Sequence, residues 1–245
     1  MNTKIAGYIV WLFLIPTLQW AQNDPAVRTL PIREVQETIS LDGVLDEQSW
    51  GDAELAKDFW QYFPFDTSMA VAHTEVKVLY DESHIYIAAV LYDSLPGEYI
   101  TQSLRRDYRG PNTDGFSIVI DPFRDQTNGF FFGITPFGVR REGLIANGGE
   151  SGEDLDLSWD NIWEGEVKVY EDRWVAEVSI PFTTLRFRGG ASEWGINFYR
   201  IDTKYNERSV WSRVPRQLPL VNLAFTGILK WDRPLNKEGG NVTLI

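Results

Sequence analysis

Short runs of alternating apolar and polar residues, each ended by a turn signal, constrain the fold of this chain more than any other feature. Thr74–Tyr80 alternates cleanly, and His84–Tyr92, which follows a three-residue polar turn, is almost entirely apolar, β-branched or aromatic. Glu164–Tyr170 and Arg173–Ile180 repeat this arrangement later in the chain. Two such runs around a tight polar turn are typical of a β-hairpin, so the sequence predicts two hairpins.

Further runs of the same kind indicate that the whole domain is built from strands. No long segment with a helical period separates them, which disfavours a βαβ fold. We therefore predict an all-β fold, an antiparallel, jelly-roll-like β-sandwich of about ten strands. The additional runs are 115–120, 129–134, 194–202, 208–213 and 225–231.

One short helix is expected near the start of the domain. Asp42-Gly43 lies between apolar residues, and glycine supplies the positive φ that a tight turn requires. Asp46 is the predicted N-cap of the helix that follows, and Trp50 lies on its apolar side. The segment Leu41–Trp50 is thus interpreted as the beginning of the folded domain.

Composition excludes several classes of function. The chain has 245 residues and a net charge of −12. A protein that binds nucleic acid is expected to carry a basic surface, so this charge argues against nucleic-acid binding. There is no cysteine, which excludes disulfides, thiolate catalysis and cysteine-based metal sites. His73 and His84 are the only histidines, so a histidine-rich metal site is impossible.

The N-terminal segment has the pattern of a secretory signal peptide. Lys4 precedes the apolar run Ile5–Leu18, and Ala21 stands at the expected cleavage position. We predict a signal peptide at 1–21, a polar leader at 22–35 that contains Pro25 and Pro31, and a single domain at 36–245. The predicted location is periplasmic, outer-membrane-associated or extracellular, in a bacterium.

The order of motifs resembles the family 9 carbohydrate-binding modules. Ile39 to Trp50 fits the Ile-x-Leu-Asp-Gly-x-Leu-Asp-Glu-x-x-Trp type opening of that family, and the similarity continues over residues 36–231. Later landmarks are Thr74–Asp81, Asp114–Ile118, Trp174–Phe182 and Trp194–Phe198. The resemblance implies an exported β-sandwich that binds oligo- or polysaccharides through loops at one end and is associated with carbohydrate catabolism and glycoside hydrolase systems.

Other motifs are similar to a narrower group, in which such a domain precedes a region that looks like an outer-membrane barrel. They include Asp121–Asp125, Thr135–Val139 and Trp159–Glu164. This chain stops at Ile245, which leaves open a truncated product or a stand-alone sensor. A structural, plug-like domain packed on an outer-membrane barrel is accordingly the second functional hypothesis.

Relatives in the family clamp a terminal sugar between two aromatic rings, and the matching loops here differ from that pattern. One falls near Asp107-Tyr108, and the other, Pro215–Asn222, contains no aromatic residue. We expect other aromatic and polar side chains to take these roles, since sugars need ring faces and hydrogen-bonding groups. Packing in the core is the alternative for each tryptophan. The expected ligand-binding residues are Arg105, Arg106, Tyr108, Asn112, Trp159, Trp163, Trp211 and Arg213.

Two groups of carboxylates have the composition of calcium ligands, because Ca²⁺ takes about six to eight oxygen atoms. Asp121 and Asp125 form the first group, and Asp154, Asp156 and Asp160 form the second. Relatives in the family are similar in carrying structural calcium. Solvated acidic loops are the alternative explanation for both groups.

Catalysis by this chain alone is not expected. Glycoside hydrolysis needs two carboxylates roughly 5 to 10 Å apart, and no motif singles out such a pair. Gly-x-Ser-x-Gly and the glycine-rich phosphate loops are absent from the sequence. An O-glycosyl hydrolase is therefore the third and weakest functional hypothesis.

Overall fold

The computed structural model describes residues 27–108 and 112–235, and within them it is an all-β protein with one five-residue helix. The predicted signal peptide lies outside the described residues. Within the described ranges, no helix has the length and apolar character that a membrane span requires. The elements are β1 (Thr29–Glu34), α1 (Gln48–Asp52), β2 (Leu55–Ala56), β3 (Trp60–Phe63), β4 (Thr74–Tyr80), β5 (His84–Tyr92), β6 (Gly115–Asp121), β7 (Gly129–Ile134), β8 (Arg140–Ile145), β9 (Leu155–Asp156), β10 (Glu164–Val169), β11 (Arg173–Pro181), β12 (Ala191–Asp202), β13 (Glu207–Val210) and β14 (Gly227–Leu235).

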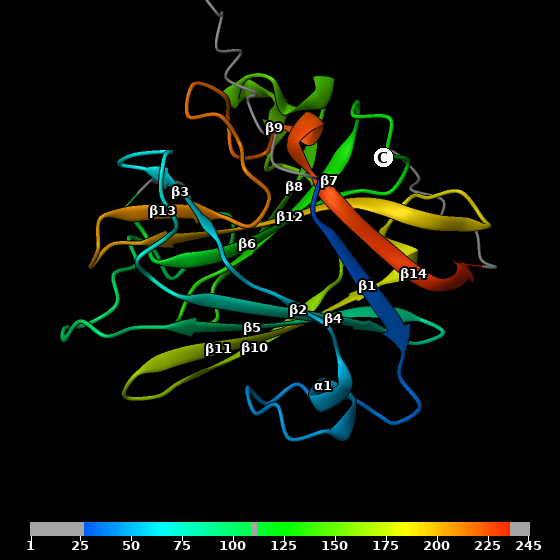
Figure 1. Cartoon of the computed structure of the whole chain (residues 1–245), viewed down its shortest axis with the longest axis horizontal. Helices are drawn as coiled ribbons and strands as arrows, with labels where there is room; N and C mark the ends of the chain where they lie inside the picture. Colours follow the sequence, from blue (N-terminus) through cyan, green and yellow to red (C-terminus); the bar gives the residue numbers. More distant parts are fainter. Residues whose placement is uncertain (1–26, 109–111, 236–245) are drawn as a thin grey trace, which may run out of the picture.

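The described strands form one continuous hydrogen-bonded sheet that curls over so that its two halves face each other (Figure 1). One half runs β10-β11-β5-β4, and the other runs β14-β12-β6-β7-β8-β9, with β1 between them. The predicted hairpins β4/β5 and β10/β11 are confirmed. The all-β prediction is confirmed, but the expected antiparallel sandwich of about ten strands differs from the single 14-stranded sheet that the described residues form. β1 joins the two halves in parallel, and β2, β3 and β9 are too short to give a sequence pattern.

Strand β1 corrects part of the prediction that residues 22–35 are a leader into the domain, because Thr29–Glu34 belong to the sheet. Its first four residues pair with β14 and its last two pair with β4, in both cases in parallel. Leu30 and Ile32 are 2% and 3% exposed and alternate with solvent-facing neighbours. Pro31 lies in the stretch where β1 is paired on one side only, so its missing N–H breaks no second ladder. The two prolines of this segment argued against a strand in the sequence, although β1 lies in the middle of the sheet.

The main core fills the space between the two halves and is rich in aromatic rings. Trp174 of β11 and Trp194 of β12 are 1% and 0% exposed, as expected for tryptophans inside patterned strands. A second apolar cluster lies on the opposite face of the half that contains β12. There the segment 212–225 covers Val119, Phe131 and Tyr199 with its own Val214, Val221 and Leu223. This covering segment lies next to β3 and shapes the site described below.

The turn and helix at the start of the domain pack on the outer side of the other half (Figure 1). Gly43 has the expected positive φ of 74°, and the N–H groups of Asp42 and Gly43 donate to the buried carboxylate of Glu177 at 3.0 and 2.7 Å. Trp50 is 1% exposed. The prediction of Asp46 as N-cap was wrong. The N-cap is Glu47, whose side chain accepts from Ser40 N instead of capping the helix.

Candidate functional site

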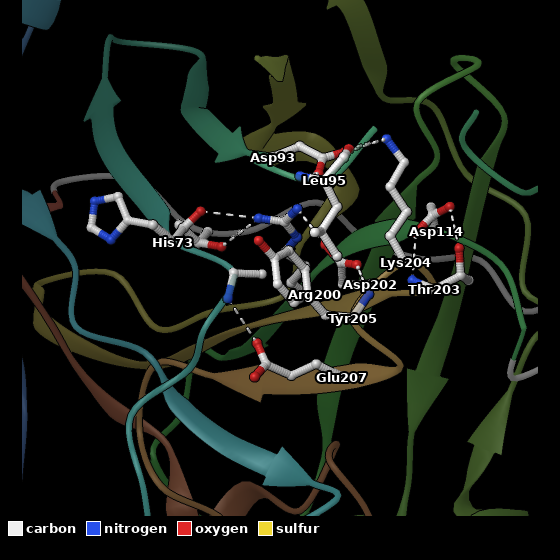
Figure 2. A network of polar contacts seen from close by, with 12 residues as sticks. His73, Asp93, Leu95, Asp114, Arg200, Asp202, Thr203, Lys204, Tyr205 and Glu207 are labelled. Carbon is white, nitrogen blue, oxygen red and sulfur yellow. Dashed lines mark hydrogen bonds and ion pairs between the residues drawn. The ribbon is translucent and has the colours of Figure 1, made fainter. Parts of the chain in front are cut away.

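A buried arginine fixes the turn between β12 and β13 (Figure 2). The Arg200 side chain is 1% exposed, and its guanidinium donates to His73 O at 3.0 Å and to Asp202 Oδ2 at 2.6 Å. Burial raises the pKa of Asp202, and the charge of Arg200 opposes that rise. Asp202 also accepts from Tyr205 N at 2.9 Å. The pair is therefore fully used in holding the two halves of the sheet and the turn together.

Three further buried carboxylates anchor the same end of the molecule. Asp114 accepts from Thr203 N and Oγ1, both at 2.7 Å, and Lys204 forms an ion pair with Asp93. Glu207 accepts from Val71 N and Ala72 N at 2.9 and 3.1 Å (Figure 2). Each carboxylate is bonded within the fold, so these acids fix the turn and the loops at this end of the molecule.

Strand β3 stands at the rim of this end and carries arginines stacked on aromatic rings. Its partner is β13, and Trp60 and Phe63 at its two ends are half-buried. The Arg213 guanidinium lies 5.3 Å from the centroid of the Trp60 ring. Those of Arg208 and Arg216 lie 5.7 and 5.3 Å from the Phe63 ring. At these distances each guanidinium is attracted to the ring, which helps to fix its position.

The first hollow at this rim, here called the Trp60 hollow, has a volume of about 410 Å³. It combines two half-buried rings, Trp60 and Phe225, with charged and hydrogen-bonding side chains. Arg213 is held in place by donating to Asp66 O at 2.8 Å. The polar members of its lining are Arg28, Asp66, Ser212, Arg213, Gln217 and Thr226.

The second hollow, here called the Phe63 hollow, has a volume of about 310 Å³ and is lined by residues from β3, the β12–β13 turn and the segment before β6. Its open polar side chains are those of Asn112, Asn206 and Arg208. A larger hollow of about 550 Å³ along β1 and β14 contains one aromatic ring, Trp231, which is 3% exposed. That larger hollow offers no ring face to a ligand.

Several residues expected to bind ligand have other roles in the structure. Trp163 and Trp211 are 2% and 3% exposed and pack against Phe132 and Phe198, so the prediction that their rings face a ligand was wrong. The alternation of the neighbouring strands continues through both and turns them into the core. Trp159, which is partly buried, packs against Phe130.

The predicted ligand-binding residues in the segment before β6 differ in exposure and in their contacts. Arg105 is exposed, and Arg106 forms an ion pair with the fully buried Glu142. Tyr108 is 5% exposed, and the Arg141 guanidinium lies 4.7 Å from its ring. Arg106 and Tyr108 therefore stabilise the fold in this structure.

Two expected residues do line open hollows, but not the same one. Asn112 belongs to the Phe63 hollow and Arg213 to the Trp60 hollow. Sequence reasoning missed Trp60, Phe63, Arg208 and Arg216. A four-residue strand with aromatic side chains at both ends gives no clear alternation, and the only available signal was the density of Trp, Phe and Tyr between positions 59 and 65.

The five carboxylates predicted to hold calcium do not converge. Asp121, Asp125 and Asp156 each accept from a nearby backbone N–H in their own loops. The Asp154 carboxylate accepts from Ser151 N at 2.7 Å and so caps the short turn that begins there. Asp160 forms an ion pair with Arg106. In the part of the chain that is described, no three potential metal-ligating side chains form a group. Neither of the two predicted groups, Asp121 with Asp125 and Asp154 with Asp156 and Asp160, therefore brings three ligating side chains together, and calcium binding stays a prediction.

An all-β fold with ring faces and hydrogen-bonding groups in hollows at one end is compatible with a carbohydrate-binding module. Residues 41–214 match the family described as carbohydrate family 9 binding domain-like, and the chain belongs to this family. The comparison with curated proteins gave no match.

Solved structures with the same fold include a family 9 carbohydrate-binding module from Caldicellulosiruptor kristjanssonii. Its complex with cellotriose has a TM-score of 0.59 and 13% identity, and its complex with glucose has 0.59 and 12%; each match covers 89% of this chain and 99% of the other. A protein from Bacteroides uniformis ATCC 8492, provisionally assigned as carbohydrate-binding, has a TM-score of 0.66 at 13% identity, over 84% and 100% of the two chains. At such identity these likenesses establish the fold.

Proposed function

We propose that this protein binds a saccharide and that the Trp60 hollow is its binding site. Membership of the family supports the proposal, as do the similar modules whose structures hold cellotriose and glucose. The observation that carries it is the meeting of two half-buried rings with Asp66, Arg213 and Gln217 in one hollow.

The chemistry of these side chains suits a sugar. The apolar face of a pyranose ring packs on an aromatic ring, and its hydroxyl groups need a few well-placed donors and acceptors. Trp60 and Phe225 supply the apolar surfaces, and Asp66 supplies an acceptor. Arg213 supplies donors whose position is fixed by stacking on Trp60. The volume of about 410 Å³ lies within the range of small-molecule sites.

Calorimetry against a panel of neutral and acidic oligosaccharides, including cellotriose and xylotriose, tests the proposal. Trp60→Ala is expected to weaken the binding of the best ligand at least about tenfold, because the stacking surface is lost, whereas Trp60→Phe retains much of it. Phe137→Ala removes another exposed ring, 52% exposed and remote in sequence from the hollow, and is the matched control that should bind normally.

Two results would refute this assignment. One is a folded wild-type protein that binds no member of the panel. The other is a Trp60→Ala variant that binds as tightly as the wild type. The melting temperature of each variant shows whether lost binding comes from lost folding.

We also propose that the protein acts outside the cytoplasm, alongside enzymes that degrade polysaccharides. The apolar run after Lys4 with Ala21 at its end supports export. Mass spectrometry of the protein recovered from cell fractions tests this. An N-terminus at Gln22 in an exported fraction is the expected result, and an uncleaved cytoplasmic protein would contradict it.

A further inference from the structure

The arginines at the rim of β3 lack carboxylate partners in a chain that has an excess of acid. The chain carries 35 Asp and Glu against 23 Lys and Arg. Yet within the described residues no ion pair is found for Arg208, Arg213 or Arg216. Three guanidinium groups without an ion pair therefore lie close together on this rim, and the Asp66 carboxylate, which accepts from Arg216 N at 3.4 Å, lies at the same rim.

The hydrogen bonds of these arginines position them without neutralising them. Arg213 donates to Asp66 O at 2.8 Å and Arg216 to Pro64 O at 2.6 Å, so both are held by main-chain atoms of the segment after β3. Within the described ranges, the Arg208 guanidinium has a ring contact with Phe63 but no hydrogen-bond acceptor. Donors of this kind remain available to a ligand.

The guanidinium groups of Arg208 and Arg216 both lie close to the ring of Phe63. Both lie within 6 Å of the Phe63 ring centroid, at 5.7 and 5.3 Å. Both charges also reach Tyr62, where they oppose the rise in pKa that burial causes. Arg208 and the Phe63 ring line the Phe63 hollow.

The two acids that line the Phe63 hollow are buried and bonded within the fold. Asp202 is 4% exposed and paired with Arg200, and Glu207 is 2% exposed and bonded to Gln61, Val71 and Ala72. The polar side chains that face outward are the neutral Asn112 and Asn206. Arg208 is the one cationic side chain in this lining, and it lies with the hydrogen-bond donors of Asn112 and Asn206 on the accessible side, whereas both carboxylates are buried.

We propose that the Phe63 hollow binds the anionic group, a carboxylate or a sulfate, of an acidic glycan. Arg208, which lines the hollow, can recognise such a group through paired N–H donors, and Arg216, which is not part of the lining, adds a second positive charge beside the same ring. The inference rests on the proposed saccharide binding, since Trp60 and Phe63 are three residues apart on an extended strand, or roughly 10 Å. One oligosaccharide can therefore contact both hollows.

Calorimetry with three trisaccharides tests this assignment: cellotriose, trigalacturonate and a sulfated galactose trisaccharide. At low salt the wild type is expected to bind one or both acidic sugars at least about tenfold more tightly than cellotriose, because charged hydrogen bonds are stronger than neutral ones. Comparison of the two acidic sugars distinguishes carboxylate from sulfate. Raising the salt concentration should reduce the preference.

The double variant Arg208→Gln/Arg216→Gln keeps hydrogen-bonding groups and removes both charges. It is expected to bind acidic sugars no more tightly than cellotriose, with unchanged affinity for any neutral sugar that the wild type binds. Arg188→Gln, at an exposed arginine outside this rim, is the matched control and should retain the preference. If the double variant does not fold, the salt dependence of the wild-type preference decides the question.

The outcomes separate the two proposals. Binding of neutral and acidic sugars with equal affinity, or a preference that survives in the double variant, overturns the anionic site and leaves the Trp60 site intact. The absence of binding to all three sugars and to the wider panel overturns both.

Discussion

Arg200 and Arg213 lie at the same end of the molecule, but their surroundings are opposite. Arg200 is 1% exposed, paired with Asp202 and bonded to main-chain oxygen. Arg213 is half-buried, stacked on Trp60 and without a carboxylate partner among the described residues. The difference shows how one residue type can hold a fold together in one place and present a binding group in another.

The physical basis of this contrast is desolvation. A guanidinium withdrawn from water needs an opposite charge and several acceptors to offset the loss of hydration. A guanidinium at the rim keeps part of its hydration, so an aromatic ring suffices to fix its position. The polar network around Arg200 is therefore expected to control stability, and the rim around β3 is expected to control binding.

Removing the buried arginine should have the largest effect. Arg200→Met leaves Asp202 buried without its partner and is expected to lower the free energy of unfolding by about 3–5 kcal/mol. Urea denaturation followed by circular dichroism measures the change. A loss below about 1 kcal/mol, the value usual for exposed pairs, would show that the contrast with the rim is false.

The corresponding change at the rim should affect binding and spare the fold. Arg213→Gln is expected to weaken saccharide binding several-fold, because donors held over Trp60 are lost, while the melting temperature stays near that of the wild type. Calorimetry and thermal denaturation of the same preparation provide both readings. A large drop in melting temperature with unchanged affinity would reverse the roles assigned to the two regions.

Glu177 adds a third case to the comparison of Arg200 with Arg213. It is a buried carboxylate whose partners are backbone N–H groups and not a cation. Burial raises its pKa, although the N–H groups of Asp42 and Gly43 partly oppose the rise. A raised carboxyl pKa means that the folded state binds the proton more tightly than the unfolded state. Stability from this group therefore increases as the pH falls through the folded pKa.

The expected result is a pH-dependent difference between the wild type and Glu177→Gln. Lowering the pH from about 7 to 5 should raise the melting temperature of the wild type relative to the variant, which has no proton to gain. Thermal denaturation at both pH values measures the difference. A relative decrease for the wild type would mean that the pKa is not raised.

The smallest expected effect is that of a chelator. Because the five predicted calcium ligands each bond locally and do not converge, EDTA should leave the melting temperature unchanged. A ligand that binds only the native state must stabilise it, so a clear decrease after EDTA would reveal a metal site that these residues do not explain.

The sequence predicted most of the fold because strand alternation records which face of a sheet is buried. The hairpins β4/β5 and β10/β11 and the turn at Gly43 follow directly from it. β1 was missed because Pro31 argues against a central strand, and only the parallel pairing on two different sides shows why proline is tolerated there.

The site was less predictable. Trp163 and Trp211 were expected to face a ligand, yet both side chains belong to the core, and the rings that line the two hollows are Trp60 and Phe63 of the short strand β3 and Phe225. The stacks of Arg213 on Trp60 and of Arg216 on Phe63 join segments about 150 residues apart in the sequence. Such long-range pairing leaves no local pattern, so only the structure reveals it.

The most direct test of saccharide binding in the Trp60 hollow is an NMR titration of the labelled protein with the tightest glycan from the panel. The indole N–H signal of Trp60, assigned by its absence in Trp60→Phe, is expected to show a large, saturable shift together with Arg213. The indole signals of the buried Trp163 and Trp194 should change little. Saturable shifts centred on another part of the surface, with the Trp60 signal unmoved, would contradict the account.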